Sequence, residues 1–222
     1  MVDRPIRILI ADDQESIRAA YRIILDSEPD MTVIAEAADG VSTVEQAQHL
    51  RPDVILADIR MPRVDGLEVT RILAGSQADD PLRVIVVTSF DLDEYVHAAL
   101  RNGACGFLLK RSGPALLAEA VRAAMAGDAL ISPQVTLRLL RHLTVAPAAA
   151  GRPAAGHELL TAREQEIARL VARGRTNAEI ADELFIAAGT VKNHLAAIQR
   201  KLGVRNRVGI AVSTWDAGTA TP

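Results

Sequence analysis

Short apolar runs alternate with amphipathic stretches from Ile6 to about Gly127. The apolar runs are Ile6–Ala11, Met31–Ala37, Val54–Ala57, Val84–Val87 and Gly106–Leu109. They are too short for helices and mostly apolar on consecutive residues, which is typical of parallel strands covered on both faces. Helical periodicity marks the stretches between them: Glu15–Ser27, Val41–Leu50, Leu67–Ala74, Asp93–Asn102 and Pro114–Ala126. Five strand–helix units in succession predict a doubly wound α/β domain with five parallel strands.

The rest of the chain has only helical and linker-like patterns. Ser132-Pro133, a capping side chain followed by proline, predicts a helix that runs to about Leu143. Residues 145–156, VAPAAAGRPAAG, have one charge and no apolar periodicity, which is typical of a flexible linker. We therefore expect an α/β domain at 1–128, a linker with its helix at 129–157 and a small all-α domain at 158–222.

Four short helices are predicted from Leu159 onward. Thr161 with Glu164, and Thr176 with Glu179, match the capping box, in which hydroxyl and carboxylate satisfy backbone N–H groups. Apolar residues then recur at helical spacing: Ile167, Leu170, Val171; Ile180, Ala181, Leu184; and Val191, Leu195, Ile198, Leu202. A last helix is expected at about Val208–Trp215, as core or as a dimer surface. Together these helices predict a compact bundle.

Charge is divided unevenly along the chain. Residues 1–130 contain 13 lysines and arginines against 21 aspartates and glutamates, whereas residues 131–222 contain 12 against 7. This asymmetry is a weak indication of a nucleic-acid-binding tail. The single cysteine, Cys105, permits no intramolecular disulfide. The sequence shows no signal-peptide pattern and no apolar run long enough for a membrane helix, so we expect a cytoplasmic protein without membrane contacts.

Several polar residues follow directly after the predicted strands or close them. They are Asp12, Asp13, Asp58, Thr88, Ser89 and Lys110. The carboxyl ends of parallel strands meet at one edge of an open sheet, where such domains place their sites. Three carboxylates in one cleft repel each other unless a cation shares the site or their pKa values rise. Oxygen ligands without His or Cys favour Mg²⁺ as the cofactor.

A carboxylate beside Mg²⁺ and a lysine can attack a phosphoryl group, because the two cations neutralise the transferring oxygens. The product would be an acyl phosphate on an aspartate. The plainer alternative is that Asp12 and Asp13 cap the next helix while Asp58 ends a strand. That alternative leaves Thr88 and Lys110 at the same edge unexplained.

Four motifs, ILIADDQ, DVILADIRMPRVDG, VIVVTSFD and GACGFLLK, resemble the receiver domains of bacterial response regulators over residues 6–126. The resemblance implies a flavodoxin-like fold and phosphorylation by a sensor histidine kinase. Asp58 is then the phosphoacceptor, and Mg²⁺ is held by Asp12, Asp13, Asp58 and the backbone carbonyl of Arg60. Thr88 is the switch hydroxyl and Lys110 the phosphate partner, while Phe107 is either the switch aromatic or plain core.

Two residues depart from the receiver pattern. Arg63 stands where the family usually has glycine, which can alter the loop and brings a cation near the site. Ser89 follows Thr88 where alanine is frequent, which can change the lifetime of the phosphate. Neither departure removes a reactive group.

Residues 158–214, which include TAREQEIARLVARGRTNAEIADELFIAAGTVKNH, are similar to LuxR/NarL-type helix-turn-helix domains. The resemblance implies a recognition helix at about Thr190–Leu202 that enters the major groove of DNA. Lys192 and Asn193 would meet base edges, and Thr190 a phosphate. Arg200, Lys201 and Arg205 would neutralise further phosphates. For each of these residues a solvated basic face is the alternative.

The start of the recognition helix departs from the family pattern, because Ala187 stands where serine is usual. An alanine cap costs about 0.5–2 kcal/mol against serine. We expect either that Thr190 takes over as the cap or that the helix start frays until DNA binds.

These observations favour a DNA-binding regulator that a histidine kinase activates through Asp58, with a homodimer on promoter DNA as its active form. We expect no enzymatic activity beyond its own phosphoryl transfer and dephosphorylation. A haloacid-dehalogenase-like phosphatase needs a second aspartate two residues after the nucleophile, where this chain has Arg60. A third hypothesis, a receiver that works through protein contacts without phosphate, stays open.

Overall fold

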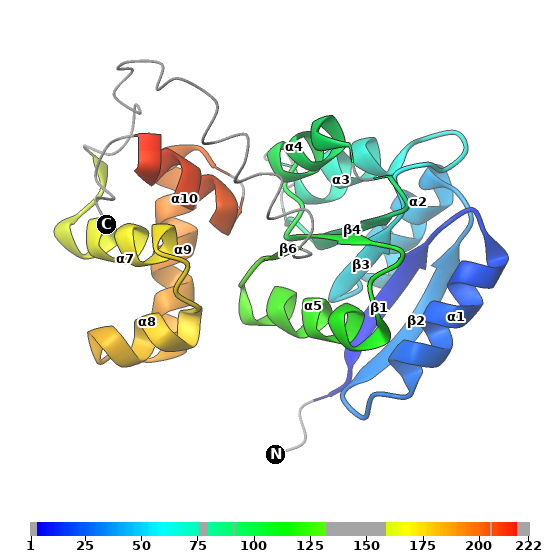
Figure 1. Ribbon diagram of the computed structural model, residues 1–222, viewed down its shortest axis with the longest axis horizontal. Helices are drawn as coiled ribbons and strands as arrows, with labels where there is room; N and C mark the ends of the chain where they lie inside the picture. Colours follow the sequence, from blue (N-terminus) through cyan, green and yellow to red (C-terminus); the bar gives the residue numbers. More distant parts are fainter. Residues whose placement is uncertain (1–3, 76–79, 91, 132–158, 205, 217–222) are drawn as a thin grey trace. The chain divides into compact units, whose positions relative to one another are not determined.

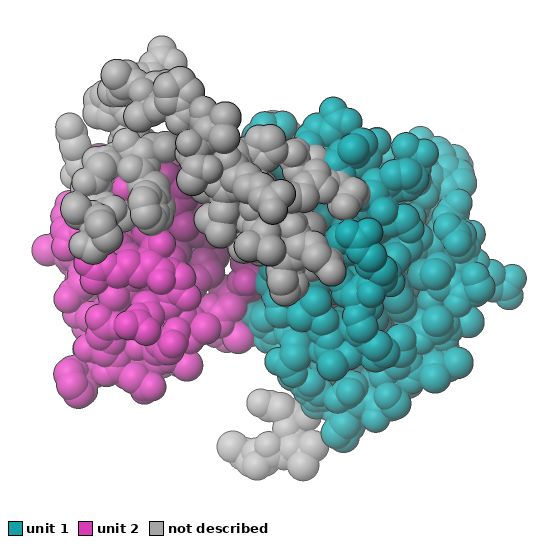
Figure 2. All heavy atoms as spheres, in the orientation of Figure 1, with its two compact units in different colours: residues 1–125, 130–139 teal, residues 126–129, 140–222 magenta. Residues whose placement is uncertain are grey.

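The computed structural model describes residues 4–75, 80–90, 92–131, 159–204 and 206–216 (Figure 1). The chain forms two compact units, coloured separately in Figure 2. The first unit comprises Met1–Met125 and Leu130–Leu139, and the second comprises Ala126–Ala129 and Leu140–Pro222. The helix predicted from Ser132 to Leu143 and the linker after it lie outside the described residues.

The first unit contains a parallel sheet with strand order β2-β1-β3-β4-β5-β6. The strands are β1 (Ile6–Ala11), β2 (Met31–Ala37), β3 (Val54–Ala57), β4 (Arg83–Thr88), β5 (Gly106–Leu109) and β6 (Leu130–Ile131). The predicted α/β class is therefore confirmed. The prediction of five strands missed β6, because a two-residue strand is too short to show any periodicity.

Helices cover both faces of this sheet, as Figure 1 shows. They are α1 (Glu15–Asp26), α2 (Gly40–Leu50), α3 (Gly66–Ala74), α4 (Asp93–Arg101) and α5 (Pro114–Ala126). Ile8 and Ile10 of β1 pack in one core cluster with α1 and α5, whereas Leu9 and Ala11 pack in another with α2 and α3. This alternation along β1 is the period of two that a strand imposes on its side chains.

Strand β2 contains one extra residue. Ile8 pairs with Val33, but the next residue of β1, Leu9, pairs with Ala35, so Ile34 is left as a bulge. Val33 packs on the α1/α5 side of the sheet, and Ala35 packs on the α2/α3 side. Because side chains alternate, the bulge turns Glu36 toward α1.

The second unit is a helical bundle of α7 (Ala162–Ala172), α8 (Asn177–Leu184), α9 (Ala188–Leu202) and α10 (Arg207–Asp216). Its core includes Ile167, Ile180, Val191, Leu195, Ile198 and Ile210. Both predicted capping boxes are present, at the start of α7 and of α8. Helix α10 contributes Ile210 to this core and packs Ala211 against it, whereas Val212 is exposed.

Helix α9 begins two residues earlier than the sequence indicates. Ala187 occupies the N-cap position with extended backbone and makes no side-chain capping bond. Thr190 lies within the first turn, so the expectation that it becomes the cap is wrong. The amides of Thr190 and Val191 both donate to the carbonyl of Ala187, at 2.8 and 3.2 Å, and Val191 is fully buried in the core.

Candidate functional site

The carboxyl ends of three strands hold the acidic residues and the lysine together. The amide of Asp12 donates to the carbonyl of Ala37 at 3.1 Å, and the amide of Asp58 donates to the carbonyl of Ala11 at 2.8 Å. The amide of Lys110 continues the ladder to the carbonyl of Thr88 at 2.8 Å. The sheet's hydrogen bonding therefore sets these side chains side by side although they lie far apart in sequence.

The ammonium of Lys110 lies between two buried carboxylates. Its Nζ is 2.6 Å from Oδ2 of Asp12 and 2.8 Å from Oδ2 of Asp58. The remaining oxygens accept backbone amides: Asp12 Oδ1 from Gln14 at 3.0 Å, and Asp58 Oδ1 from Ile59 at 2.7 Å. All three side chains are almost inaccessible, with exposed fractions of 8%, 2% and 5% for Lys110, Asp12 and Asp58.

Burial and charge change the protonation of this cluster. Burial raises the pKa of Asp12, and the neighbouring charge of Asp58 adds to the rise, while bonds from Lys110 and Gln14 oppose it. Burial works against the charged form of Lys110, but its bonds to Asp12 and Asp58 outweigh that effect and raise its pKa. Lys110 is therefore firmly charged, and Asp12 carries its charge at a cost.

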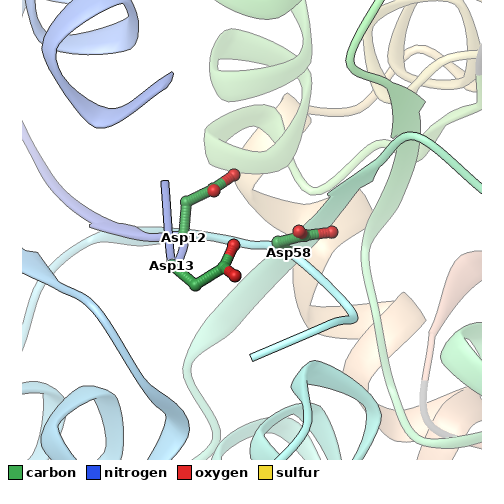
Figure 3. A group of neighbouring side chains, drawn as sticks. All are labelled: Asp12, Asp13 and Asp58. Carbon is green, nitrogen blue, oxygen red and sulfur yellow. The ribbon is translucent and has the colours of Figure 1, made fainter. Parts of the chain in front are cut away.

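The third carboxylate, Asp13, is exposed beside this pair. Among the described residues, Asp12, Asp13 and Asp58 are the group of three whose ligand oxygens lie close enough to share one metal ion, all within 4.8 Å of one another (Figure 3). One ammonium offsets three carboxylates, so the donor set has an excess of negative charge. Hard oxygen donors with such an excess fit a divalent cation of the magnesium type.

The loop after Asp58 is held tightly against the site. A Cβ at Gly66 would lie 1.9 Å from the carbonyl oxygen of Asp58, so only glycine fits there. The amide of Gly66 also donates to the carbonyl of Ile59 at 2.8 Å. Arg63 has the left-handed φ of 68° and forms an ion pair with Asp39, the N-cap of α2. The arginine that replaces the usual glycine thus ties this loop to α2.

Arg60 carries a contact that the sequence did not indicate. Its guanidinium lies 3.7 Å from the ring centroid of Phe90, which meets Tyr95 edge-on at 6.4 Å. Arg60 and Tyr95 also line a groove of about 420 Å³, together with Asp13. No motif spacing could have predicted this stack, because its members come from two loops and a helix.

Two further predicted site residues lie on β4 and β5, the strands that follow β3 in the sheet. Thr88 ends β4 and is fully buried, and its Oγ1 accepts the amide of Phe90 at 3.3 Å. Phe107, in the adjacent strand β5, is fully buried in a cluster with Val86 and Val96. The arrangement of Phe107 is that of a packed core residue.

The predicted DNA-contacting residues fall into different surroundings within the second unit. Thr190, Lys192, Asn193 and Arg200 have exposed side chains on α9. Lys201 instead binds the buried carboxylate of Glu164, at 2.9 Å to Oε1 and 2.6 Å to Oε2. Arg205 lies outside the described residues.

Two families of known proteins match the chain. The response regulator receiver domain matches residues 8–122, and the luxR family of bacterial regulatory proteins matches residues 158–214. The chain is a response regulator of the LuxR type. It is similar to the transcriptional regulatory protein LiaR of Bacillus subtilis (strain 168), with 42% identity over 207 residues that cover 93% of this chain and 95% of LiaR.

Other relatives match this response regulator over nearly its whole length. The transcriptional regulatory protein DegU of Brevibacillus brevis is 35% identical and covers 97% of the chain, which spans 95% of DegU. The crystal structure of the response regulator ChrA is 36% identical, with a TM-score of 0.52 and coverage of 95% and 96% of the two chains. The chain therefore combines a receiver with a DNA-binding domain of transcription regulators. None of its described helices is long and apolar enough to cross a membrane.

Proposed function

We propose that this response regulator is switched by phosphorylation of Asp58 and then binds promoter DNA as a homodimer. The observation that carries the proposal is the ammonium of Lys110 held between Asp12 and Asp58 at the carboxyl edge of the sheet. A sensor histidine kinase would supply the phosphoryl group from a phosphohistidine. A carboxylate oxygen of Asp58 forms the new bond to phosphorus, the phosphorus–nitrogen bond breaks, and the imidazole leaves.

Magnesium fits the acidic cluster as the resident cation. Asp12, Asp13, Asp58 and the backbone carbonyl of Arg60 would hold it, and when bound it neutralises phosphoryl oxygens during transfer. Lys110 is already charged and close to Asp58, so it can pair with a phosphoryl oxygen without first gaining a proton. Loss of its bond to Asp58 would be balanced by that new ion pair.

Thr88 supplies the link from the phosphoryl group to the rest of the receiver. Its hydroxyl accepts the amide of Phe90 and, as a donor, would turn toward a phosphoryl oxygen. That movement changes the β4–α4 loop, which carries Phe90. Phe107, packed beside β4, would then adjust its packing rather than start the change.

The DNA contacts would come mainly from the exposed face of α9. Lys192 and Asn193 lie in its first two turns, where a recognition helix reaches base edges, and Thr190 would bind a phosphate. Arg200 and Arg205 would neutralise phosphates. Lys201 would neutralise a phosphate only if its ammonium left Glu164, which makes it the weakest contributor of the set.

Phosphorylation of Asp58 is tested by comparing the wild type with Asp58→Asn after incubation with a small phosphodonor and Mg²⁺. We expect a hydroxylamine-sensitive adduct and tighter promoter binding in the wild type, and neither in the variant. Glu45→Gln, which removes an exposed carboxylate from α2, is the matched control and should behave as wild type. Equal DNA affinity of wild type and Asp58→Asn under all conditions would favour the receiver that works without phosphate.

A further inference from the structure

Arg18, near the start of α1, contacts the backbone that carries the acidic residues. Its Nη1 donates to the carbonyl oxygen of Asp12 at 2.8 Å, and its side chain is only 14% exposed. A guanidinium bond to a carbonyl is charge-assisted and stronger than an ordinary amide bond. Neither the motifs nor the spacing of acidic residues indicated a role for this arginine.

The carbonyl that Arg18 holds belongs to the peptide bond between Asp12 and Asp13. That peptide is planar, so fixing its oxygen also fixes the direction in which Asp13 leaves the strand. Asp13 is the exposed carboxylate of the three, and its side chain has no bond to Lys110. Arg18 therefore restrains the one acidic residue that the ammonium does not restrain.

The hydrogen bond to the carbonyl of Asp12, more than the contact with Glu36, fixes the position of the Arg18 guanidinium. Its Nε is buried without a hydrogen bond and lies 3.4 Å from Oε2 of Glu36. Arg22 instead makes the short contact to Glu36, at 2.5 Å from Nε to Oε1, and donates Nη1 to the carbonyl of Val33 at 3.0 Å. A buried N–H without a partner is unfavourable, so the bond to Asp12 must outweigh it.

Glu36 completes the arrangement by offsetting the charge of Arg18. The bulge at Ile34 turns Glu36 to the α1 side of the sheet, where both arginines reach it. Without that carboxylate the guanidinium would be a poorly compensated cation near a cation-binding site. Arg18 therefore donates its hydrogen bond to the carbonyl of Asp12 while Glu36 neutralises most of its charge.

We propose that Arg18 is a positioning residue for the magnesium site: it holds the Asp12–Asp13 peptide so that Asp13 faces the cation. This inference rests on the proposed function, because it assumes that Asp12, Asp13 and Asp58 bind Mg²⁺. The positioning role and the charge of Arg18 predict opposite changes in Mg²⁺ affinity when Arg18 is removed. Removing a nearby positive charge would by itself tighten Mg²⁺ binding, whereas losing the positioning bond weakens it.

The test is calorimetric titration of the unphosphorylated full chain with MgCl₂, which needs no phosphoryl transfer as a readout. Arg18→Ala should weaken Mg²⁺ binding about tenfold, the effect of losing one charge-assisted bond. Arg18→Lys, which can still donate to the carbonyl, should recover about half of that loss on a logarithmic scale. Arg22→Ala is the matched control, because Arg22 shares Glu36 but does not contact Asp12, and its Mg²⁺ affinity should stay within about twofold.

Thermal unfolding without Mg²⁺ separates positioning from folding. Should Arg18→Ala not fold, Arg18→Gln is used, and it is expected to weaken binding as Arg18→Ala does. Tighter or unchanged Mg²⁺ binding by the Arg18 variants, or equal weakening in Arg22→Ala, would overturn the positioning role while leaving the proposed function intact. A wild type that binds no Mg²⁺ would overturn both.

Discussion

Two lysines of this response regulator bind buried carboxylates, but the charges around them balance differently. Lys201 meets a single carboxylate, that of Glu164, whose oxygens also close the capping box of α7 through the amide of Thr161 at 2.7 Å. Lys110 meets two carboxylates, Asp12 and Asp58, with Asp13 close by. The first cluster is neutral and its acceptors are occupied, whereas the second has an excess of negative charge.

This difference in charge balance distinguishes a structural ion pair from a site that can bind a further ion or group. A satisfied, neutral pair gains nothing from a further cation, and its role is to fasten α9 to α7. A buried cluster with surplus charge is unfavourable until another cation or a phosphoryl group joins it. Sequence motifs name the residues of both clusters, but only the geometry shows that one is complete and the other is not.

The largest expected effect concerns the neutral cluster. Lys201→Met leaves Glu164 buried without its cation, which should lower the free energy of unfolding of the second unit by about 2 kcal/mol. The neighbouring Arg200→Met removes an exposed charge and should change it by less than about 0.5 kcal/mol. Urea denaturation, followed by amide exchange in α7 and α9, measures both. Equal effects would mean that the Glu164 bond contributes nothing.

A smaller effect of opposite sign is expected in the acidic cluster. Asp12→Asn removes a carboxylate whose pKa burial has raised, so without Mg²⁺ it should stabilise the first unit by about 1 kcal/mol. Saturating Mg²⁺ should reverse the order, because the cation stabilises the wild type and binds the variant poorly. The measurement is the urea midpoint with and without MgCl₂. Destabilisation by Asp12→Asn in both conditions would show that the excess of negative charge does not lower the stability of the first unit.

The smallest effect is a difference in acid sensitivity. Burial works to raise the pKa of Glu164, but bonds from Lys201 and Thr161 outweigh it and hold that pKa below its usual value. Its stabilisation is therefore present above about pH 4.5, the unfolded value, and is lost as the pH falls through the lower folded value. Glu164→Gln should reduce the acid-induced loss of stability in the second unit by about 0.5 kcal/mol. An unchanged acid profile would exclude Glu164 as a titrating contributor.

The sequence predicted those features that repeat with a period or follow a local rule. The five main strands follow from consecutive apolar residues, and the two capping boxes from Thr and Glu three residues apart. The meeting of Asp12, Asp58 and Lys110 followed from strand ends alone, because parallel strands leave their carboxyl ends on one edge. The assignment of roles to Thr88 and to the DNA-contacting residues stays a prediction.

Other features depend on tertiary contacts that no local pattern encodes. Lys201 looked like a DNA-facing cation, since its position on α9 gives no sign of the carboxylate that meets it from α7. Arg18 and the Arg60–Phe90 stack were missed because their partners are a backbone carbonyl and a ring from another loop. The start of α9 was misplaced because Ala187 gives no capping signal in the sequence, although its carbonyl accepts the first amides of the helix.

The bulge at Ile34 has a consequence for anyone who builds chimeric regulators from related receivers. Segments exchanged across β2 must contain the same number of residues as the segment they replace. A donor strand without the extra residue would turn every later side chain of the strand to the opposite face of the sheet. Glu36 would then be directed at α2 and α3, and Arg18 and Arg22 would lose their shared counterion. A graft that looks neutral in an alignment would thus remove the counterion of an arginine that holds the backbone of the acidic cluster.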